Sequence, residues 1–292
     1  MSLATTLAPV ARMRDLAELG KPRLSLLVIF TAAAGLALAP GALGTLRASI
    51  FLAATCVLVA AANTLNCWIE REIDGLMRRT RNRPLPAGRL QPATALASGL
   101  VLAALALGWL AFATNPWTVA LGALALVSYV LVYTPLKRLT PWALVVGAVP
   151  GALPPLMGWT AAAGRPGAPG WALFGILFCW QLPHFIAIAI YLADDFRKAE
   201  LPVLPLARGE AAARRWLLAG TLLLLAVSLA AARLPHVGNA YLFAALALGL
   251  PFVALAFQGW RSGAGEGWAR RVFAYSLVYL PVVLTVLVLD AA

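Results

Sequence analysis

Charged residues are scarce in this chain, and their scarcity excludes most soluble folds. Only 12% of the residues are Asp, Glu, Lys or Arg, whereas 62% are hydrophobic. A soluble domain has about 25% charged residues and about 45–50% apolar ones. We therefore expect an all-α protein that uses lipid as its solvent, as a polytopic bundle of membrane helices.

Cysteines and nucleotide-binding motifs are equally scarce. The three cysteines, Cys56, Cys67 and Cys179, lie in or beside apolar segments, which argues against a disulfide framework. The sequence contains no CxxC pair, no Walker loop and no GxGxxG motif. In a soluble protein the net charge of +12 would suggest nucleic-acid binding. In a membrane protein topology explains this charge, so no nucleic-acid partner is expected.

Nine apolar segments are candidates for membrane helices, which need about 20 residues each. They cover residues 24–42, 47–68, 92–113, 117–134, 143–162, 170–192, 215–233, 239–258 and 272–290. Of the 23 Lys and Arg residues, 20 lie in or beside alternate connecting segments. The positive-inside rule then places the N-terminus and the loops after every second span in the cytoplasm. We predict a cytoplasmic segment, 1–23, and a single membrane domain, 24–292, with about nine helices around a central cavity.

Proline occurs inside two of these spans, where it would interrupt a helix. The span 143–162 holds Pro150, Pro154 and Pro155, and the span 170–192 holds Pro183. Broken helices at membrane depth are tolerated where they are buried in protein or line a cavity. We therefore predict a cavity next to these two spans.

The strongest chemical signal is a set of oxygen-bearing side chains after the second span. Asn66, Glu70 and Asp74 are four residues apart, so they share one helix face if the helix continues through Asp74. Oxygen ligands suit a hard cation such as Mg²⁺, which also binds substrate phosphates. Glu72 points elsewhere and is expected to be solvated or paired with an arginine. The alternative is that the three residues are only the polar end of a helix.

A basic loop with the sequence RRTRNRP, residues 78–84, follows this acidic face. Beside a metal held by carboxylates, arginines can donate hydrogen bonds to phosphate oxygens. Lys137 and Arg138 form a smaller basic patch, and Asp194 and Asp195 form a second acidic cluster that could complete the site. The alternative for the basic residues is that their charge only sets the membrane topology. The alternative for Asp194 and Asp195 is that they belong to an exposed charged loop.

One histidine lies inside the sixth span, in the segment WQLPHF that begins at Trp180. Ionisable residues within a membrane span are functional candidates by default. His184 could ligate iron, act as a general acid or base, or form a hydrogen bond in the core. The residues alone leave these interpretations open. His236 lies in a short outer loop, where no role is expected.

Together these motifs resemble those of the UbiA-type intramembrane prenyltransferases. The pattern Asn66-x3-Glu70-x3-Asp74 with the basic loop is similar to the aspartate-rich first motif of that family. Several segments resemble its heme-modifying branch, in order from residue 21 to about residue 210: KPRLSLLVIFTAAAGL, NCWIEREIDGLMRRTRNRPLPAGRL, YTPLKRLT, GAVPGALPPLMGW, WQLPHF and DDFRKAELPVLP. Two positions depart from the family pattern, with Glu70 where Asp is usual and Phe196 where Tyr is usual.

The resemblance implies an activity and a location. The activity would be the Mg²⁺-dependent transfer of a farnesyl group from farnesyl diphosphate to a vinyl group of heme b. Addition of water would then give heme O, with diphosphate as the other product. The location would be the bacterial inner membrane, with multiple spans and the active site toward the cytoplasm. Besides the lipid bilayer, the implied partner is a heme A synthase or a terminal oxidase assembly.

The resemblance also implies a role for individual residues. The catalytic and metal-binding residues would be Asn66, Glu70, Asp74 and Asp195. The residues that contact diphosphate would be Arg79, Arg83, Lys137 and Arg138. The residues that bind heme would be His184, Trp180 and Gln181.

Two other functions are compatible with these motifs. One is a UbiA-type prenyltransferase with an aromatic acceptor, such as a quinone precursor. The other is a transporter, although a transporter is expected to carry polar residues near the membrane midplane. Here ten of the eleven Asp and Glu residues belong to cytoplasmic segments or to the helix ends that meet them. Release of diphosphate from farnesyl diphosphate would eliminate the transporter, and co-purified heme would argue against the aromatic acceptor.

Overall fold

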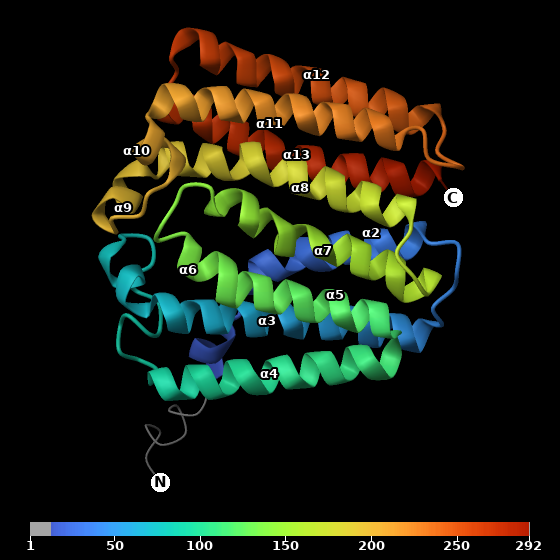
Figure 1. Cartoon of the computed structure of the whole chain (residues 1–292), viewed down its shortest axis with the longest axis horizontal. Coiled ribbons are helices and arrows are strands. Elements are labelled where there is room, and N and C mark those ends of the chain that lie inside the picture. The colour runs from blue at the N-terminus through green and yellow to red at the C-terminus, as the bar shows by residue number, and fades with distance from the viewer. Residues whose placement is uncertain (1–12, 292) are drawn as a thin grey trace.

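A computed structural model describes residues 13–291, which form an all-helical bundle (Figure 1). Residues 1–12 of the predicted cytoplasmic segment 1–23, and residue 292, lie outside the described residues. The long helices are α2 (Pro22–Leu38), α3 (Thr45–Leu76), α4 (Pro92–Ala113), α5 (Pro116–Val127), α7 (Ala143–Ala163), α8 (Ala168–Tyr191), α11 (Glu210–Ala231), α12 (Asn239–Ser262) and α13 (Glu266–Asp290). The short ones are η1 (Ser128–Tyr133), α6 (Thr134–Leu136), α9 (Ala193–Lys198) and α10 (Leu204–Arg208).

Within residues 13–291, eight helices are long and apolar enough to cross a membrane. One of them is the continuous segment Pro116–Leu136, in which the π-helical stretch η1 joins α5 to α6. The remaining predicted span corresponds to α2, a shorter apolar helix of 17 residues. The multi-pass helical architecture is therefore confirmed, whereas the count of nine spans and their orientation across the membrane stay predictions.

The long helices form two groups, each with its own hydrophobic core. One core lies among α2, α3, α4 and α7, and the other lies mainly among α8, α11, α12 and α13. In Figure 1 these groups are the lower and upper halves of the bundle, and α7 packs against α8 where they meet. Small residues let α2 approach α7 closely, because a Cβ on Gly158 would lie only 2.0 Å from the carbonyl oxygen of Ala32.

The prolines of the fifth and sixth predicted spans lie inside continuous helices. Pro150, Pro154 and Pro155 belong to α7, and Pro183 belongs to α8. The expectation of broken helices is therefore wrong, because packing from neighbouring helices holds these segments helical. The predicted cavity is present, and Pro150 and Pro154 line it. The irregular backbone is instead η1, a type of local widening that often marks functional sites.

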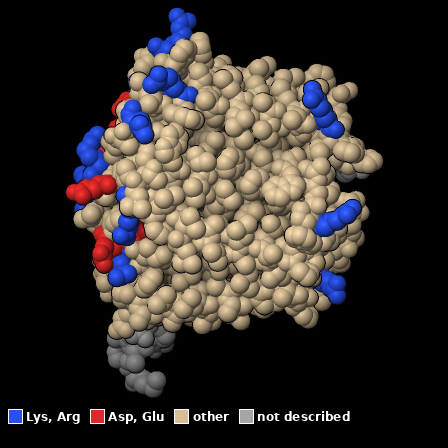
Figure 2. Space-filling view, viewed as in Figure 1, with Lys and Arg blue, Asp and Glu red and all other residues tan. Residues whose placement is uncertain are grey.

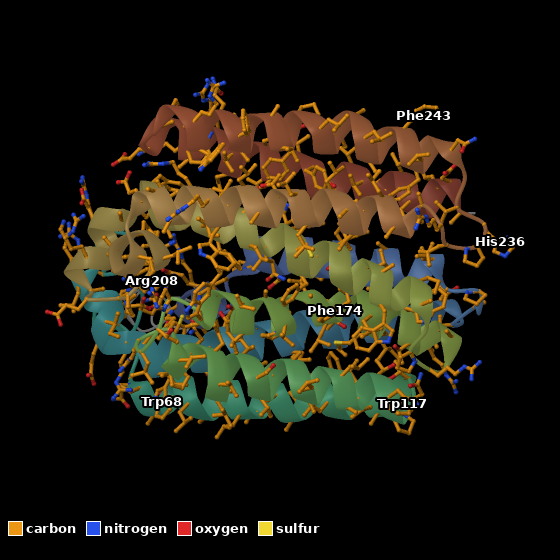
Figure 3. All side chains as sticks on the ribbon, turned by 45° about the horizontal axis from the view of Figure 1, so that its top comes forward. Trp68, Trp117, Phe174, Arg208, His236 and Phe243 are labelled. Atoms are coloured by element: carbon orange, nitrogen blue, oxygen red, sulfur yellow. The ribbon has the colours of Figure 1, made fainter. Side chains whose placement is uncertain are left out.

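Charged side chains gather at one end of the bundle. On the face seen in Figure 2, basic and acidic residues are clustered along one edge, and only isolated basic residues lie at the opposite edge. Figure 1 shows that the clustered edge holds α9, α10 and the loop after α3. In Figure 3, Arg208 lies at this end, and His236 lies at the other end. We call the charged end the site end of the bundle.

Candidate active site

The last turns of α3 carry the three predicted metal ligands on one buried face. α3 continues to Leu76, so Asn66, Glu70 and Asp74 belong to a single helix. Their exposed fractions are 2%, 3% and 1%. Glu72 points away, with a side chain that is 80% exposed and pairs with Arg71 at 3.3 Å. Because buried carboxylates are costly without compensating charge, cations must lie close to this face.

Each of the three buried residues contacts a basic side chain. The pairs are Lys21 Nζ with Asn66 Oδ1 at 3.1 Å, Arg83 Nη1 with Asp74 Oδ2 at 2.7 Å, and Lys137 with Glu70. The amide nitrogen of Asn66 in turn donates to the Thr134 hydroxyl at 3.1 Å. The three basic residues come from the start of α2, the loop after α3 and the end of α6, so only the tertiary fold brings them to this face.

Charge and burial shift the pKa values of two of these bases in opposite directions. Burial lowers the pKa of the Lys21 ammonium group below the usual value for lysine. Burial acts in the same direction on Arg83, but nearby groups, chiefly the Asp74 carboxylate, together outweigh it, so the pKa of Arg83 is raised. Arg83 is therefore a permanent cation beside Asp74.

The loop after α3 connects the first acidic cluster to the second. The Thr80 hydroxyl donates to the Asp74 carbonyl at 2.7 Å, which folds the loop back onto its own helix. The backbone N–H of Arg79 donates to Asp195 Oδ2 at 3.3 Å. Asp194 points outward, with a side chain that is 78% exposed and paired with Arg197. Asp195 is thus the acid of this pair that faces the basic loop.

The N-terminal segment is fastened to the same loop by Arg89. Its guanidinium contacts Asp15 Oδ1 at 3.0 Å, Glu18 Oε2 at 3.1 Å and the carbonyl of Asn82 at 2.8 Å. Asn63 Nδ2 adds a bond to the carbonyl of Gly20 at 3.2 Å. These contacts position the backbone just before Lys21. Neither Lys21 nor Arg89 was predicted as a site residue from the sequence, although Lys21 is the only lysine before the first predicted span.

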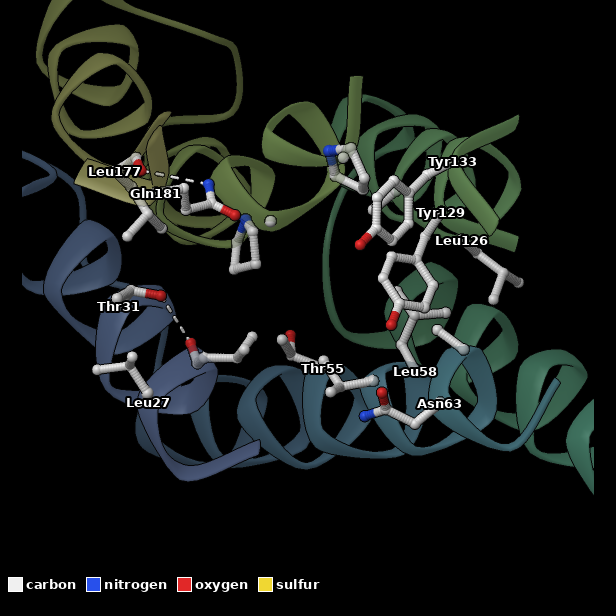
Figure 4. Close-up of a pocket in the computed structure, with 18 of the residues that line it drawn as sticks. Leu27, Thr31, Thr55, Leu58, Asn63, Leu126, Tyr129, Tyr133, Leu177 and Gln181 are labelled. Carbon is white, nitrogen blue, oxygen red and sulfur yellow. Dashed lines mark hydrogen bonds between the residues drawn. The ribbon is translucent and has the colours of Figure 1, made fainter. Parts of the chain in front are cut away.

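A cavity of about 310 Å³ lies beside α3, and its lining on that helix ends at Asn63, one turn before Asn66 (Figure 4). Its walls come from α2, α3, α5, η1, α7 and α8. The lining is largely apolar, and Figure 4 shows the Tyr129 and Tyr133 hydroxyls facing it across from Gln181. On α3 the lining runs from Asn63 to Thr55, about 12 Å along a helix. We call this space the inner cavity. Neither tyrosine was predicted as a site residue from the sequence.

The predicted heme-binding residues line the inner cavity on α8. Trp180 Nε1 donates to the Ser276 carbonyl at 2.7 Å, and Gln181 Nε2 donates to the Ala148 carbonyl at 3.0 Å. The His184 ring stacks on Trp180 with centroids 4.4 Å apart. The Ser276 hydroxyl donates to the Phe273 carbonyl at 2.6 Å, so it must accept from His184 Nδ1 at 2.7 Å. This hydrogen bond leaves the lone pair of His184 on Nε2.

A second cavity of about 240 Å³ lies at the site end, between the start of α7, the end of α8 and the segment with α9 and α10. It shares Tyr133 and Phe185 with the inner cavity. Its other walls are apolar except for Thr140 and two cations, Arg79 and Lys137. We call this space the outer cavity.

The donor atoms on α3 fit a magnesium ion that also binds substrate. Within residues 13–291 no three His, Cys, Asp or Glu side chains are close enough to hold a metal ion alone. Asn66 supplies an amide oxygen beside two carboxylates, and Mg²⁺ commonly takes one or two carboxylates plus substrate phosphates. Buried Glu70 Oε1 makes an ion pair with Lys137 but no hydrogen bond of normal geometry. That oxygen therefore has coordinating capacity left.

Comparison with known proteins identifies the family. The UbiA prenyltransferase family matches residues 28–278, so the chain belongs to this family of membrane-embedded prenyl-transferring proteins. A relative from Anaeromyxobacter sp. (strain Fw109-5), a protoheme IX farnesyltransferase, is 51% identical over 95% of this chain and 94% of its own length. The protein of the same name from Myxococcus xanthus is 49% identical over 94% of each chain.

Solved structures share the fold at low sequence identity. A digeranylgeranylglyceryl phosphate synthase superimposes with a TM-score of 0.81 at 17% identity, over 96% of this chain and 98% of that chain. A UbiA homologue from Archaeoglobus fulgidus, solved with GPP and Mg²⁺, gives a TM-score of 0.65 at 17% identity, over 94% and 99% of the two chains. The predicted all-α membrane architecture is thus confirmed as the UbiA fold.

Proposed function

We infer that this chain transfers a farnesyl group from farnesyl diphosphate to a vinyl group of heme b, giving heme O and diphosphate. The observation that carries this function is near-full-length identity of about 50% to protoheme IX farnesyltransferases. The buried acidic face with its three bases is consistent with a diphosphate substrate. The aromatic-acceptor alternative has no such support, and a transporter has no need of this face.

We propose that Asn66, Glu70, Asp74 and Asp195 hold magnesium diphosphate. Mg²⁺, when bound, would neutralise charge that develops on the leaving diphosphate. Lys137 and Arg83 now contact Glu70 and Asp74, so each can turn from a carboxylate to a phosphate oxygen when the ligand arrives. Lys21 lies on the same face. Arg79 and Arg138 were also predicted to contact phosphate. The Arg138 guanidinium instead donates a hydrogen bond to the Ile69 carbonyl at 3.0 Å, which stabilises this part of α3.

The inner cavity is proposed to hold the farnesyl chain in a dry environment. The bond between farnesyl C1 and the diphosphate oxygen breaks, and its electron pair leaves with diphosphate. The π electrons of the heme vinyl group form the new carbon–carbon bond with C1. Water then adds to the cation on the former vinyl group and loses a proton. Apolar walls around C1 prevent earlier capture by water, and the Tyr129 and Tyr133 hydroxyls point into the same cavity.

We propose that His184, supported by Trp180 and Gln181, contacts the heme acceptor. With Nδ1 bonded to Ser276, the Nε2 lone pair is the one available to a ligand. His184 also precedes Phe185, which lines both cavities. Trp180 and Gln181 hold this wall through their bonds to α13 and α7.

The proposed setting is the bacterial inner membrane, with the site end toward the cytoplasm. The basic residues that cluster there agree with the positive-inside rule. Because heme O is membrane-soluble, we propose that it passes directly to a heme A synthase or a terminal oxidase assembly in the same bilayer.

The test is a pigment assay in bacterial membranes that lack their own heme O synthase. Hemes are extracted after expression of the chain and separated by chromatography with mass detection. Heme O should accumulate with the wild type and disappear with Asp74→Ala at equal protein level. Heme b alone from well-folded protein would contradict the function, and conversion of a hydroxybenzoate or naphthoate would then support an aromatic acceptor.

A further inference from the structure

The outer cavity has a charge pattern that the diphosphate site does not explain. Arg79 lines this cavity, and its guanidinium makes no ion pair or hydrogen bond to the side chains and backbone that the structure describes. Only its backbone N–H is engaged, by Asp195. The Arg79 side chain is exposed at the cavity, so its guanidinium is free to reach a ligand there. A guanidinium forms strong charge-assisted hydrogen bonds to carboxylates, so it suits an anionic ligand.

The chemistry of the walls indicates the class of ligand that this cavity would bind. Phe185, Phe196 and Leu204 line the cavity together with other apolar residues, and Lys137 adds a second cation beside Arg79. Arg79 lies on the loop after α3, at the end of the bundle where charged residues cluster. A molecule that fits this pattern is broad and apolar, with carboxylates along one edge. Heme b has this form, because its two propionates lie together on one side of a flat macrocycle.

The two cavities are neighbours and share wall residues. Tyr133 and Phe185 belong to both linings, and Lys137, which lines the outer cavity, pairs with Glu70 of the acidic face. A prenyl chain in the inner cavity and an acceptor in the outer cavity would therefore meet next to the diphosphate. His184 lies on the inner side of Phe185, at the same junction.

We propose that the outer cavity is the acceptor site, and that Arg79 binds a propionate carboxylate of heme b. This proposal rests on the proposed function, and it gives Arg79 an acceptor role in place of the phosphate contact predicted from the sequence. The carboxylate edge faces the site end of the bundle, and the macrocycle packs against Phe185 and Phe196. Lys137 lies between the two substrates and neutralises both.

The first test compares heme b with heme b dimethyl ester, in which both carboxylates are methylated. Steady-state rates are measured with the full-length protein in lipid nanodiscs. Arg79→Gln should raise the KM for heme b about tenfold, the loss expected for one charged hydrogen bond, and change the KM for farnesyl diphosphate less than twofold. The wild type should bind the ester about tenfold more weakly than heme b, whereas Arg79→Gln should bind both alike. The matched control is Arg78→Gln, an exposed arginine of the same loop that lines neither cavity.

A second pair of variants tests the cavity without altering charge. Thr140→Trp fills the outer cavity from a loop, and Thr140→Val keeps its size. Thr140→Trp should raise the KM for heme b at least tenfold and leave the binding of farnesyl diphosphate unchanged, while Thr140→Val should match the wild type.

Three results would overturn the proposal. The first is an Arg79→Gln protein whose KM rises for farnesyl diphosphate and not for heme b, which would return Arg79 to the phosphate. The second is an Arg79→Gln protein that still distinguishes heme b from its ester. The third is a Thr140→Trp protein with normal heme kinetics. If the wild type makes no heme O, the proposed function itself is wrong. If the wild type makes heme O but Arg79→Gln and Thr140→Trp leave the KM for heme b unchanged, only the acceptor-site proposal is wrong.

Discussion

Lys21 Nζ donates a hydrogen bond to Asn66 Oδ1 at 3.1 Å, although 45 residues separate the two in sequence. Lys21 immediately precedes α2, with a backbone φ of 50°, a conformation that few residues other than glycine adopt. Arg89 and Asn63 fasten the segment that leads into this strained residue. Backbone strain that surrounding contacts maintain often marks a functional position. Lys21 is therefore expected to have a role in substrate binding besides its place at the start of α2.

Removing the Lys21 ammonium group should weaken the use of farnesyl diphosphate. Lys21→Met is expected to raise the KM for farnesyl diphosphate roughly thirtyfold, equivalent to about 2 kcal/mol for one charged hydrogen bond. Steady-state kinetics with heme b at saturation measure the effect. Lys21→Arg is the control because it keeps the charge and should recover most of the affinity. Equal defects in both variants would mean that only the lysine geometry at the start of α2 matters.

The Arg83–Asp74 pair should contribute to stability as well as to activity. Asp74 is buried, so Arg83→Met leaves an uncompensated carboxylate and should lower the free energy of unfolding by about 3 kcal/mol. Adding Asp74→Asn removes that charge and should restore much of the stability without restoring turnover. Thermal unfolding in the absence of substrate compares the two. A double variant that is no more stable than Arg83→Met would show that the pair is not energetically coupled.

Chelation of divalent metal should abolish the release of diphosphate from farnesyl diphosphate. EDTA is expected to stop the reaction and added Mg²⁺ to restore it, because the leaving group needs its charge neutralised. Glu70→Gln should raise the Mg²⁺ concentration that gives half-maximal rate, whereas exposed Glu72→Gln should not. A colorimetric diphosphate assay provides the readout. Full activity in EDTA would contradict the assignment of the α3 face to a metal.

The orientation of His184 should depend on Ser276. Ser276→Ala removes the acceptor of the Nδ1 hydrogen bond and frees the imidazole to change tautomer. We expect Ser276→Ala and His184→Ala to change the absorption spectrum of bound heme, and to weaken the reaction with heme b more than the binding of farnesyl diphosphate. An unchanged spectrum together with normal turnover would make His184 a core residue only.

Arg89 should act through the N-terminal segment. Its contacts to Asp15 and Glu18 are partly exposed, so each is worth only about 0.2–1 kcal/mol. Arg89→Gln should therefore raise the KM for farnesyl diphosphate modestly, by about two- to fivefold, as Lys21 loses its support. Arg81→Gln, an exposed arginine of the same loop, is the control. If Lys21→Met and Arg89→Gln have additive effects on KM, Arg89 does not act through Lys21.

Local sequence patterns were sufficient to predict much of the fold and one helix face of the candidate site. Apolar run length predicted nine spans, and within residues 13–291 eight helices are long and apolar enough to cross a membrane. The spacing of Asn66, Glu70 and Asp74 predicted a common helix face, because helical periodicity needs no knowledge of neighbours. The same reasoning failed at Pro150 and Pro154, since packing from other helices decides whether a proline interrupts a span.

The sequence alone determined that the chain is a helical membrane protein with an acidic helix end followed by a basic loop. These features depend on hydrophobicity and on spacing within single segments. Only the tertiary structure decided which base meets which acid, that Arg79 faces a separate cavity, and that Ser276 directs the His184 ring. The contacts Lys21–Asn66, His184–Ser276 and Arg79–Asp195 join residues 45 to 116 positions apart. They depend on how helices pack, and no periodicity within one helix encodes the residues that its neighbours will present.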